Sequence, residues 1–220
     1  MKIGVLALQG AFIEHEKMLE SLGAECFEIR QKRDLMQDFD GLVLPGGEST
    51  VIGKLLWELD LLEPIREKIQ RGLPVLGTCA GLILLAEEIS GEENVYLGTL
   101  PVKVKRNAYG RQLGSFFTEE EMKGIGRVPM TFIRAPYIEA VPEDTPEEVE
   151  ILAEVQGRIV AVRCRNQIGI AFHPEVTKDT RIHTYFMELC KKTNAGKSNI
   201  NEVEINRNAP PPLYKRNPLF

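Results

Sequence analysis

Short segments rich in valine, isoleucine and leucine alternate with amphipathic segments along about the first ninety residues of the chain. The apolar segments are KIGVLAL, AECFEI, GLVLPGG and LPVLGT, and the patterns between and after them predict helices over 11–23, 49–72 and 79–91. Buried strands that alternate with helices are typical of parallel sheets covered on both faces. The alternation therefore predicts an α/β fold, a flavodoxin-like three-layer sandwich with a central, mostly parallel sheet.

The second half of the chain has a different pattern. After about residue 95, strand-like segments are interrupted by glycine and proline, and a last helix is expected within DTRIHTYFMELCKK. We expect these strands to join the same sheet, which gives one domain over residues 1–194. Residues 195–220 contain a proline triplet and few aliphatic side chains, so we expect a poorly ordered or non-native tail.

Charge and cysteine spacing exclude several classes of function. The net charge is −5 and basic residues are mixed with acidic ones, which argues against nucleic acid as a partner. No apolar run is long enough for a membrane span and no signal peptide is evident, so a cytoplasmic location is expected. Cys26, Cys79, Cys164 and Cys190 form no CxxC pair. The spacing therefore suggests neither a metal site nor a disulfide framework. No cofactor is expected for this chain.

Cys79 lies where a buried strand meets a helix through the small residues of GTCAG. This strand–turn–helix context is typical of a nucleophile elbow. The start of a helix favours a thiolate, and the backbone N–H of Ala80 is placed to stabilise an oxyanion. A buried structural cysteine is the alternative, and the turn alone leaves both roles open.

His173 and Glu175 flank a proline at the end of the strand in QIGIAFHPEV. Proline favours an extended conformation for the residue before it, and residues two apart in extended backbone point to the same side. We therefore expect Glu175 to orient His173 as the base for Cys79. His15 and His183 lie in amphipathic segments, and we expect both to be structural or interface residues without a catalytic neighbour.

Two kinds of loop residue are candidates for binding a substrate. In GLVLPGGEST, the glycines allow close approach of a ligand, and Gly47 is suited to give a second oxyanion donor. Arg106 and Arg134 lie beside glycine or proline and are suited to bind a carboxylate. An ordinary βα turn and two solvated arginines are the alternatives.

The motifs GTCAG and FHPE resemble those of class I, or triad, glutamine amidotransferases. LALQGAFIEH, LPGGEST, GTCAGLILLA, RNAYGRQ and FIRAP make the resemblance more specific. Together they resemble the glutaminase subunits of the ribose-5-phosphate-dependent pyridoxal 5′-phosphate synthase. The resemblance extends from about residue 2 to 190.

The resemblance implies a role for each matching position. Cys79 would be the nucleophile, His173 the general base and acid, and Glu175 the residue that orients the histidine. The positions that match glutamine-contacting residues are Gly47, Glu48, Ser49, Arg106, Ile133 and Arg134. The implied reaction is hydrolysis of L-glutamine, with ammonia released into a channel of a separate barrel-shaped synthase subunit that makes pyridoxal 5′-phosphate (vitamin B6).

Two other functions remain open at this point. The same triad serves glutaminase subunits for histidine, tryptophan, purine and pyrimidine synthesis, although LPGGEST and RNAYGRQ argue against those. A non-catalytic binding or redox-sensing protein on the same scaffold would use Cys79 as an oxidisable thiol. Such a protein would not need His173 and Glu175 beside it.

Overall fold

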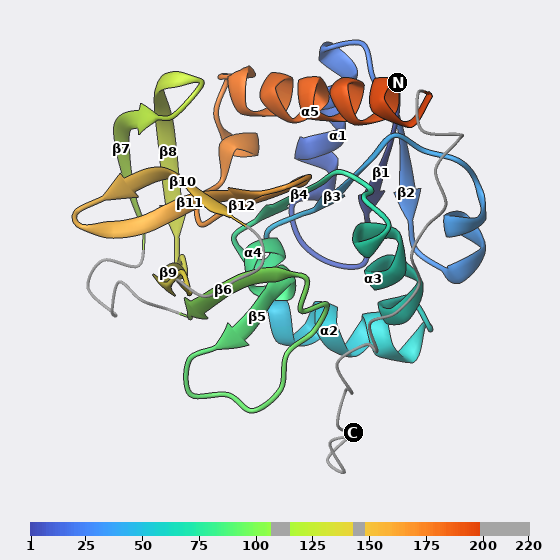
Figure 1. Cartoon of the computed structure of the whole chain (residues 1–220), viewed down its shortest axis with the longest axis horizontal. Helices are drawn as coiled ribbons and strands as arrows, with labels where there is room; N and C mark the ends of the chain where they lie inside the picture. Colours follow the sequence, from blue (N-terminus) through green and yellow to red (C-terminus); the bar gives the residue numbers. More distant parts are fainter. Residues whose placement is uncertain (107–114, 143–147, 199–220) are drawn as a thin grey trace.

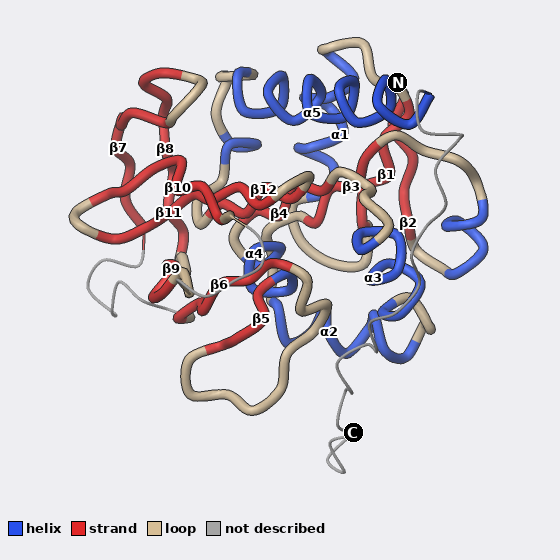
Figure 2. Tube along the Cα trace, viewed as in Figure 1, coloured by secondary structure: helices blue, strands red, loops and turns tan. Residues whose placement is uncertain are grey.

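The computed structural model describes residues 1–106, 115–142 and 148–198. A twisted sheet of ten strands forms the middle layer, with helices α1 and α5 on one face and α2, α3 and α4 on the other (Figure 1). Figure 2 shows the same arrangement, with strands between two groups of helices. The predicted three-layer α/β architecture is confirmed.

The strands follow the sequence order only in part. Their bounds are β1 Lys2–Leu6, β2 Glu25–Ile29, β3 Gly41–Leu44, β4 Val75–Thr78, β5 Ala86–Ile89, β6 Leu100–Lys105, β7 Ser115–Met122, β8 Gly126–Ile133, β9 Tyr137–Ala140, β10 Val149–Val155, β11 Arg158–Cys164 and β12 Gln167–Ile170. The order across the large sheet is β2-β1-β3-β4-β12-β11-β9-β6-β5, with β10 paired to β11, while β7 and β8 form a separate hairpin.

The helical elements are short except for the last one. They are α1 Phe12–Ser21, η1 Lys32–Met36, α2 Ser49–Glu58, α3 Leu62–Gln70, α4 Ala80–Leu85, η2 Pro174–Val176 and α5 Arg181–Ser198, where η marks a 3₁₀ helix. None of the described helices is both long and apolar enough to cross a membrane.

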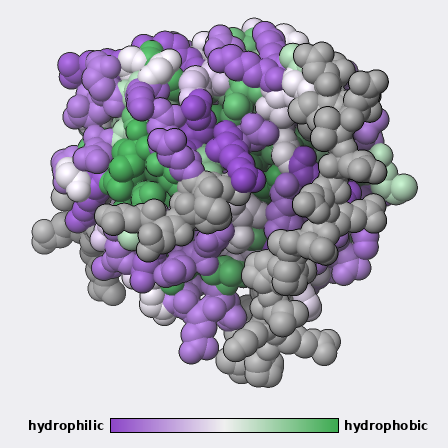
Figure 3. All heavy atoms as spheres, viewed as in Figure 1, coloured by the Kyte–Doolittle hydropathy of each residue, from purple (hydrophilic) through white to green (hydrophobic). Residues whose placement is uncertain are grey.

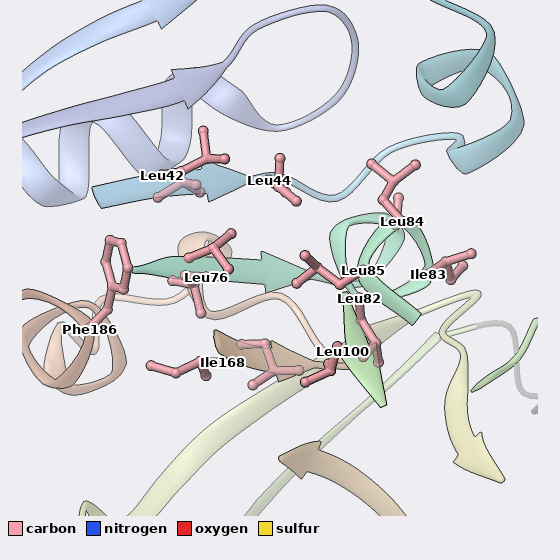
Figure 4. Packing of buried hydrophobic residues seen from close by; sticks show 14 of the residues in the cluster. Leu42, Leu44, Leu76, Leu82, Ile83, Leu84, Leu85, Leu100, Ile168 and Phe186 are labelled. Atoms are coloured by element: carbon pink, nitrogen blue, oxygen red, sulfur yellow. The ribbon is translucent and has the colours of Figure 1, made fainter. Parts of the chain in front are cut away.

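The central strands of the sheet are parallel and buried. β1, β3, β4 and β12 run in the same direction, and every residue of β3, β4 and β12 is buried. Figure 4 shows Leu42 on β3, Leu76 on β4 and Ile168 on β12. Leu85 of α4 and Phe186 of α5 lie beside these strands. Strands buried on both faces explain the continuous apolar runs in the sequence.

Helix α2 ends where the sequence pattern predicted an uninterrupted helix over 49–72. Asp60 has φ of 54°, a left-handed conformation that cannot continue an α-helix. Pro64 lies in the first turn of α3, where its missing N–H costs nothing, whereas in a continuous helix its ring would clash with the carbonyl of Asp60. The proline therefore divides the expected helix into α2 and α3.

The helix expected over 79–91 also ends early. α4 stops at Leu85, and Ala86–Ile89 form β5, which pairs in parallel with β6. Pairing with a neighbouring strand outweighs the helix propensity of these residues, because propensity is a weak preference that tertiary contacts override. The expectation that the strands of the second half all join the same sheet was wrong for β7 and β8, which form a separate two-stranded sheet.

The last helix extends beyond the expected domain boundary. α5 continues to Ser198, past residue 194, and the remainder of the expected tail lies outside the described residues. Figure 3 shows that hydrophilic side chains cover much of the face in view, with smaller hydrophobic patches between them.

Gly81 provides a test of how tightly α4 packs against the sheet. A Cβ at this position would lie 2.0 Å from the backbone oxygen of Leu44. We expect Gly81→Ala to lower the free energy of unfolding by about 1–3 kcal/mol, since a backbone atom cannot move aside as a side chain can. Urea unfolding measures this change.

Gly196→Ala is the matched control. A Cβ at Gly196 meets no atom within 4 Å, and the residue lies in α5. Alanine should therefore be neutral or stabilising there by up to about 1 kcal/mol. Equal stability of the two variants would contradict the proposed contact.

Candidate active site

Cys79 occupies the turn between β4 and α4. Its φ of 48° and ψ of −97° are unusual for a residue with a side chain. The backbone N–H of Cys79 donates a hydrogen bond to the oxygen of Ile170 at 2.8 Å, which ties the turn to β12. Backbone strain of this kind is held in place by the surrounding structure and occurs often at functional sites. The predicted strand–turn–helix geometry is confirmed.

His173 follows β12, the strand next to β4. Its backbone N–H donates to Thr131 at 2.8 Å, and its Nδ1 lies 2.7 Å from Oε1 of Glu175. The two side chains meet as predicted, but the reason given from the sequence was wrong. Pro174–Val176 form a turn of 3₁₀ helix, so the backbone between the two residues is not extended.

Charge interactions determine the protonation of this pair. Burial lowers the pKa of His173, but hydrogen bonds and charges from Cys79 and Glu175 outweigh it and raise the pKa from 6.5 to about 10. Burial raises the pKa of Glu175, but His15 and His173 lower it, and the net change is downward. The ring of His173 therefore lies as an imidazolium beside the ionised carboxylate of Glu175.

The loop after β3 packs directly against His173. A Cβ on Gly46 would lie 2.3 Å from Cε1 of the His173 ring, and a Cβ on Gly47 would lie 2.4 Å from Oε1 of Gln9. That same Gln9 oxygen accepts a hydrogen bond from the backbone N–H of Glu48 at 2.7 Å. Glycine at both positions lets the loop approach the catalytic side chains closely.

A cavity of about 230 Å³ opens over Cys79. The residues that line it are Gln9, Gly47, Glu48, Ser49, Cys79, Ile83, Arg106, Ile133, Arg134 and His173. The structure therefore brings together every predicted site residue except Ala80 and Glu175, which lie directly behind Cys79 and His173. A larger hollow of about 470 Å³ lies beside the β7–β8 turn, but its lining contains no cysteine or histidine.

The two predicted arginines differ in their partners. The guanidinium of Arg106 donates to Glu92 at 2.9 Å, to Glu48 at 3.1 Å and to Thr50 at 2.8 Å. Arg134 has φ of 45° and lines the cavity. Arg106 is thus held by neighbouring carboxylates. The rest of RNAYGRQ lies outside the described residues.

Ile133 precedes Arg134 at the end of β8. Its backbone oxygen lies 4.0 Å from Sγ of Cys79, and its side chain is partly exposed. Ala80 is the first residue of α4, so its N–H has no hydrogen-bond partner within the helix. That N–H is therefore free for an oxyanion beside Cys79.

His15 and His183 are both buried, as expected of structural residues, but the prediction that neither has a neighbour in the predicted triad was wrong for His15. His15 Nε2 lies 3.4 Å from Oε2 of Glu175, and His15 Nδ1 lies 2.9 Å from Nε2 of His183. All three histidines of the chain are buried in this one cluster. The helical spacing of the two residues concealed the fact that both helices cover the same face of the sheet.

Sequence reasoning also missed Gln9, Gly46 and Ile83. Gln9 follows β1 at the carboxyl edge of the sheet, where parallel α/β sheets bind ligands, so its position was a usable signal. The contact of Gly46 with His173 and the place of Ile83 in the cavity depend on tertiary packing. No local pattern could have indicated them.

The other cysteines have ordinary structural surroundings. Burial raises the pKa of Cys26 and of Cys190 to about 12, and Cys164 is buried in β11. Thiols of this kind are unreactive because they hold their protons. Among the described residues, no group of three histidine, cysteine, aspartate or glutamate side chains could hold a metal ion.

Comparison with known proteins places this site in a family. The model of the SNO glutamine amidotransferase family matches residues 5–192. The chain belongs to the SNO glutamine amidotransferase family. Relatives in this family include the pyridoxal 5′-phosphate synthase subunit PdxT of Desulfitobacterium hafniense (strain DSM 10664 / DCB-2), 65% identical over 188 residues, which cover 86% of this chain and 92% of that protein.

PdxT of Streptococcus pneumoniae (strain CGSP14) is 57% identical over 195 residues, which cover 87% of this chain and 98% of that protein. A crystal structure described as a glutamine amidotransferase is similar at a TM-score of 0.80 and 44% identity, covering 86% of this chain and 98% of that one. PurLQS from Thermotoga maritima shares the fold, with a TM-score of 0.58 at 16% identity over 90% of this chain and 98% of that one.

The coupling between Cys79 and His173 can be measured by titration. We expect the His173 ring to keep its proton above neutral pH in the wild-type protein and to lose it near pH about 10. Cys79→Ala removes a hydrogen bond and a charge that raise this pKa, so the titration should move to lower pH. Nitrogen-15 NMR of the imidazole rings gives the measurement.

Cys26→Ala is the control for this titration, since Cys26 lies on β2 at the far end of the strand order from β12. It should leave the titration of His173 unchanged. An identical His173 pKa in wild type and Cys79→Ala would show that the two side chains are not coupled.

Proposed function

We propose that the chain hydrolyses L-glutamine to glutamate and ammonia through Cys79, His173 and Glu175. The observation that carries the proposal is that Cys79 and His173 line the same cavity while Nδ1 of His173 lies 2.7 Å from the buried carboxylate of Glu175. Family membership indicates glutamine as the amide donor.

The first step is attack on the side-chain amide. His173 already holds the proton of Cys79 as an imidazolium, and the thiolate forms a C–S bond to the amide carbon while the C=O electron pair moves to oxygen. Backbone N–H groups of Gly47 and Ala80 are the proposed donors to that oxyanion. The carboxylate of Glu175 stabilises the imidazolium by accepting a hydrogen bond from Nδ1 of His173.

The second step releases ammonia and restores the enzyme. The tetrahedral intermediate collapses, the C–N bond breaks, and His173 delivers its proton to the departing nitrogen. Water then loses a proton to His173 and attacks the thioester, and the C–S bond breaks to leave the thiolate of Cys79 beside protonated His173. The sum is glutamine and water giving glutamate and ammonia.

The charged residues of the cavity suit the α-amino and α-carboxylate groups of a free amino acid. Arg134 is the proposed partner of the carboxylate, and Glu48 is suited to the ammonium group. Arg106 supports Glu48 through its hydrogen bond at 3.1 Å. Ser49 and the backbone at Ile133 complete the proposed binding set at the cavity wall.

The ammonia serves the synthesis of pyridoxal 5′-phosphate. Relatives at 57% and 65% identity, aligned over nearly their whole length, are named subunits of pyridoxal 5′-phosphate synthase. The partner is accordingly the synthase subunit of that complex, and the channel to its barrel belongs to the proposal. The glutaminases of other biosynthetic pathways are disfavoured by this identity, and a redox-sensing role leaves His173 and Glu175 without a purpose.

A cytoplasmic location is part of the same proposal. The nucleophile must remain a free thiol, and reducing compartments maintain free thiols. None of the four cysteines, all of which lie in the described part of the chain, forms a disulfide in the structure, in agreement with such a compartment.

The nucleophile is tested by Cys79→Ala. We expect glutaminase activity to fall by at least about 10⁴-fold, because the covalent intermediate cannot form. The assay measures glutamate release in the presence of the synthase subunit. Cys26→Ala should retain activity, and turnover by Cys79→Ala near the wild-type rate would contradict the mechanism.

Arg134→Gln tests recognition of the substrate carboxylate. A charge-assisted hydrogen bond contributes about 1.5–3 kcal/mol, so KM for glutamine should rise about 10- to 100-fold while kcat changes less. Arg127→Gln, on the exposed start of the same strand β8, is the matched control. An unchanged KM in Arg134→Gln would show that another residue binds the carboxylate of the substrate.

A further inference from the structure

Glu175 has one oxygen that the triad does not use. Its Oε1 faces His173, while its Oε2 is buried and has no hydrogen-bond partner within normal distance among the described residues. The side chain is fully shielded from solvent. A buried, ionised oxygen without a donor costs free energy, so the nearest polar hydrogen determines how Glu175 is held.

The nearest candidate donor is His15, in the first turn of α1. Its Nε2 lies 3.4 Å from Oε2 of Glu175 and 3.1 Å from Oγ1 of Thr78, the residue before Cys79. Its Nδ1 lies 2.9 Å from Nε2 of His183, in the first turn of α5. The ring of His15 therefore contacts Glu175 and the residue that precedes Cys79, and it is itself fully buried.

The contacts distinguish the two neutral tautomers of His15. With hydrogen on Nε2, the N–H of His15 lies between the oxygens of Glu175 and Thr78. Its Nδ1, which then carries no hydrogen, accepts a hydrogen bond from the Nε2–H of His183. Nδ1 of His183 is then without hydrogen, in agreement with its burial without a partner. Every N–H in this arrangement points at an acceptor.

The opposite tautomer leaves two groups unsatisfied. With hydrogen on Nδ1, His15 donates to His183, and the lone pair on its Nε2 faces the lone pairs of Glu175. His183 must then carry its hydrogen on Nδ1, which is buried with no acceptor. A buried N–H and a buried carboxylate oxygen without partners make this arrangement the less stable one.

Burial also keeps both outer histidines neutral. It lowers the pKa of His15, against an opposing effect of Glu175, and it lowers the pKa of His183 well below its usual value. A neutral ring has one N–H, so its position decides which neighbour receives a hydrogen bond.

We propose, on the basis of the function proposed above, that His15 is a positioning residue of the triad whose Nε2–H directs the carboxylate of Glu175. His183 selects that tautomer by donating its own Nε2–H to His15. The catalytic chain thus extends from Cys79 through His173 and Glu175 to two helices on one face of the sheet. His15 acts through Glu175, since it touches neither the substrate nor the thiol.

The proposed contact has a consequence for the chemistry. Glu175 must be ionised to accept Nδ1–H of His173 and stabilise the imidazolium. Loss of the His15 N–H removes a donor that faces the ionised carboxylate, so we expect the pKa of Glu175 to rise. As the pH falls, Glu175 then loses its charge at a higher pH than in the wild-type protein. The acid limb of the pH profile, where kcat falls as the pH is lowered, therefore moves to higher pH.

The groups that can influence such a titration lie on several elements. They are His173 beside Glu175, Cys79 beside His173, Glu14 on α1 and His183 on α5. His15 is the member of this set that faces Oε2 of Glu175.

Kinetics of the complex with the synthase subunit test the proposal. His15→Leu should lower kcat for glutamine about 10- to 100-fold, as small misplacements of a catalytic group do, with little change in KM and an acid limb at higher pH. His15→Gln carries an amide N–H at a similar reach and should restore most of kcat and the original limb. If His15→Leu keeps both kcat and the limb, or if His15→Gln is no better than His15→Leu, the positioning role is wrong.

Cys190→Ala is the control for general loss of stability. Its sulfur is buried against Gly41, away from the histidine cluster, so the variant should lower the melting temperature without moving the acid limb. If the acid limb of kcat moves as far in Cys190→Ala as in His15→Leu, the effect of His15 is one of packing and not of hydrogen bonding to Glu175.

Nitrogen-15 NMR of the three histidines gives a second readout that does not depend on activity. We expect His15 and His183 to be neutral with hydrogen on Nε2. Hydrogen on Nδ1 of His15 would overturn the proposal even if kcat falls. If wild type fails to release glutamate while the NMR result holds, the proposed function fails and the hydrogen-bond arrangement stands.

Discussion

A carboxylate without access to water is the constraint on which this active site depends. The side chain of Glu175 is shielded completely, so its charge must be balanced by neighbouring donors. His173 supplies one donor and becomes oriented toward Cys79 as a result. One hydrogen bond between His173 and Glu175 therefore both stabilises the buried charge of Glu175 and orients the ring of His173.

The sheet explains why residues from distant parts of the sequence meet at this carboxylate. β1, β3, β4 and β12 are parallel neighbours, so the segments that follow them meet at one edge. Gln9, Gly46, Cys79 and His173 each follow one of these strands. The approach of these segments is close because glycine occupies the positions where a Cβ would overlap a neighbour.

The sequence predicts those parts of the site whose signals are local. The turn at Cys79 is visible because small residues lie between an apolar strand and an apolar helix. The pairing of His173 with Glu175 was expected for the wrong reason, since a 3₁₀ turn and not extended backbone brings them together. The roles assigned to them rest on resemblance and stay predictions. His15 was misjudged because its contact with His183 joins helices 168 residues apart in the sequence. The end of α4 escaped prediction for a similar reason, since it depends on a partner strand.

The contacts of the glycines bear on how the site moves. Where backbone meets backbone, as Gly81 meets Leu44 and Gly10 meets Gly46, no side chain can rotate to let the segments separate. Local opening of the catalytic turn therefore requires the strands beneath it to part. The turn and the central strands then belong to one cooperative unit, and their amide hydrogens exchange with solvent only when that whole unit unfolds.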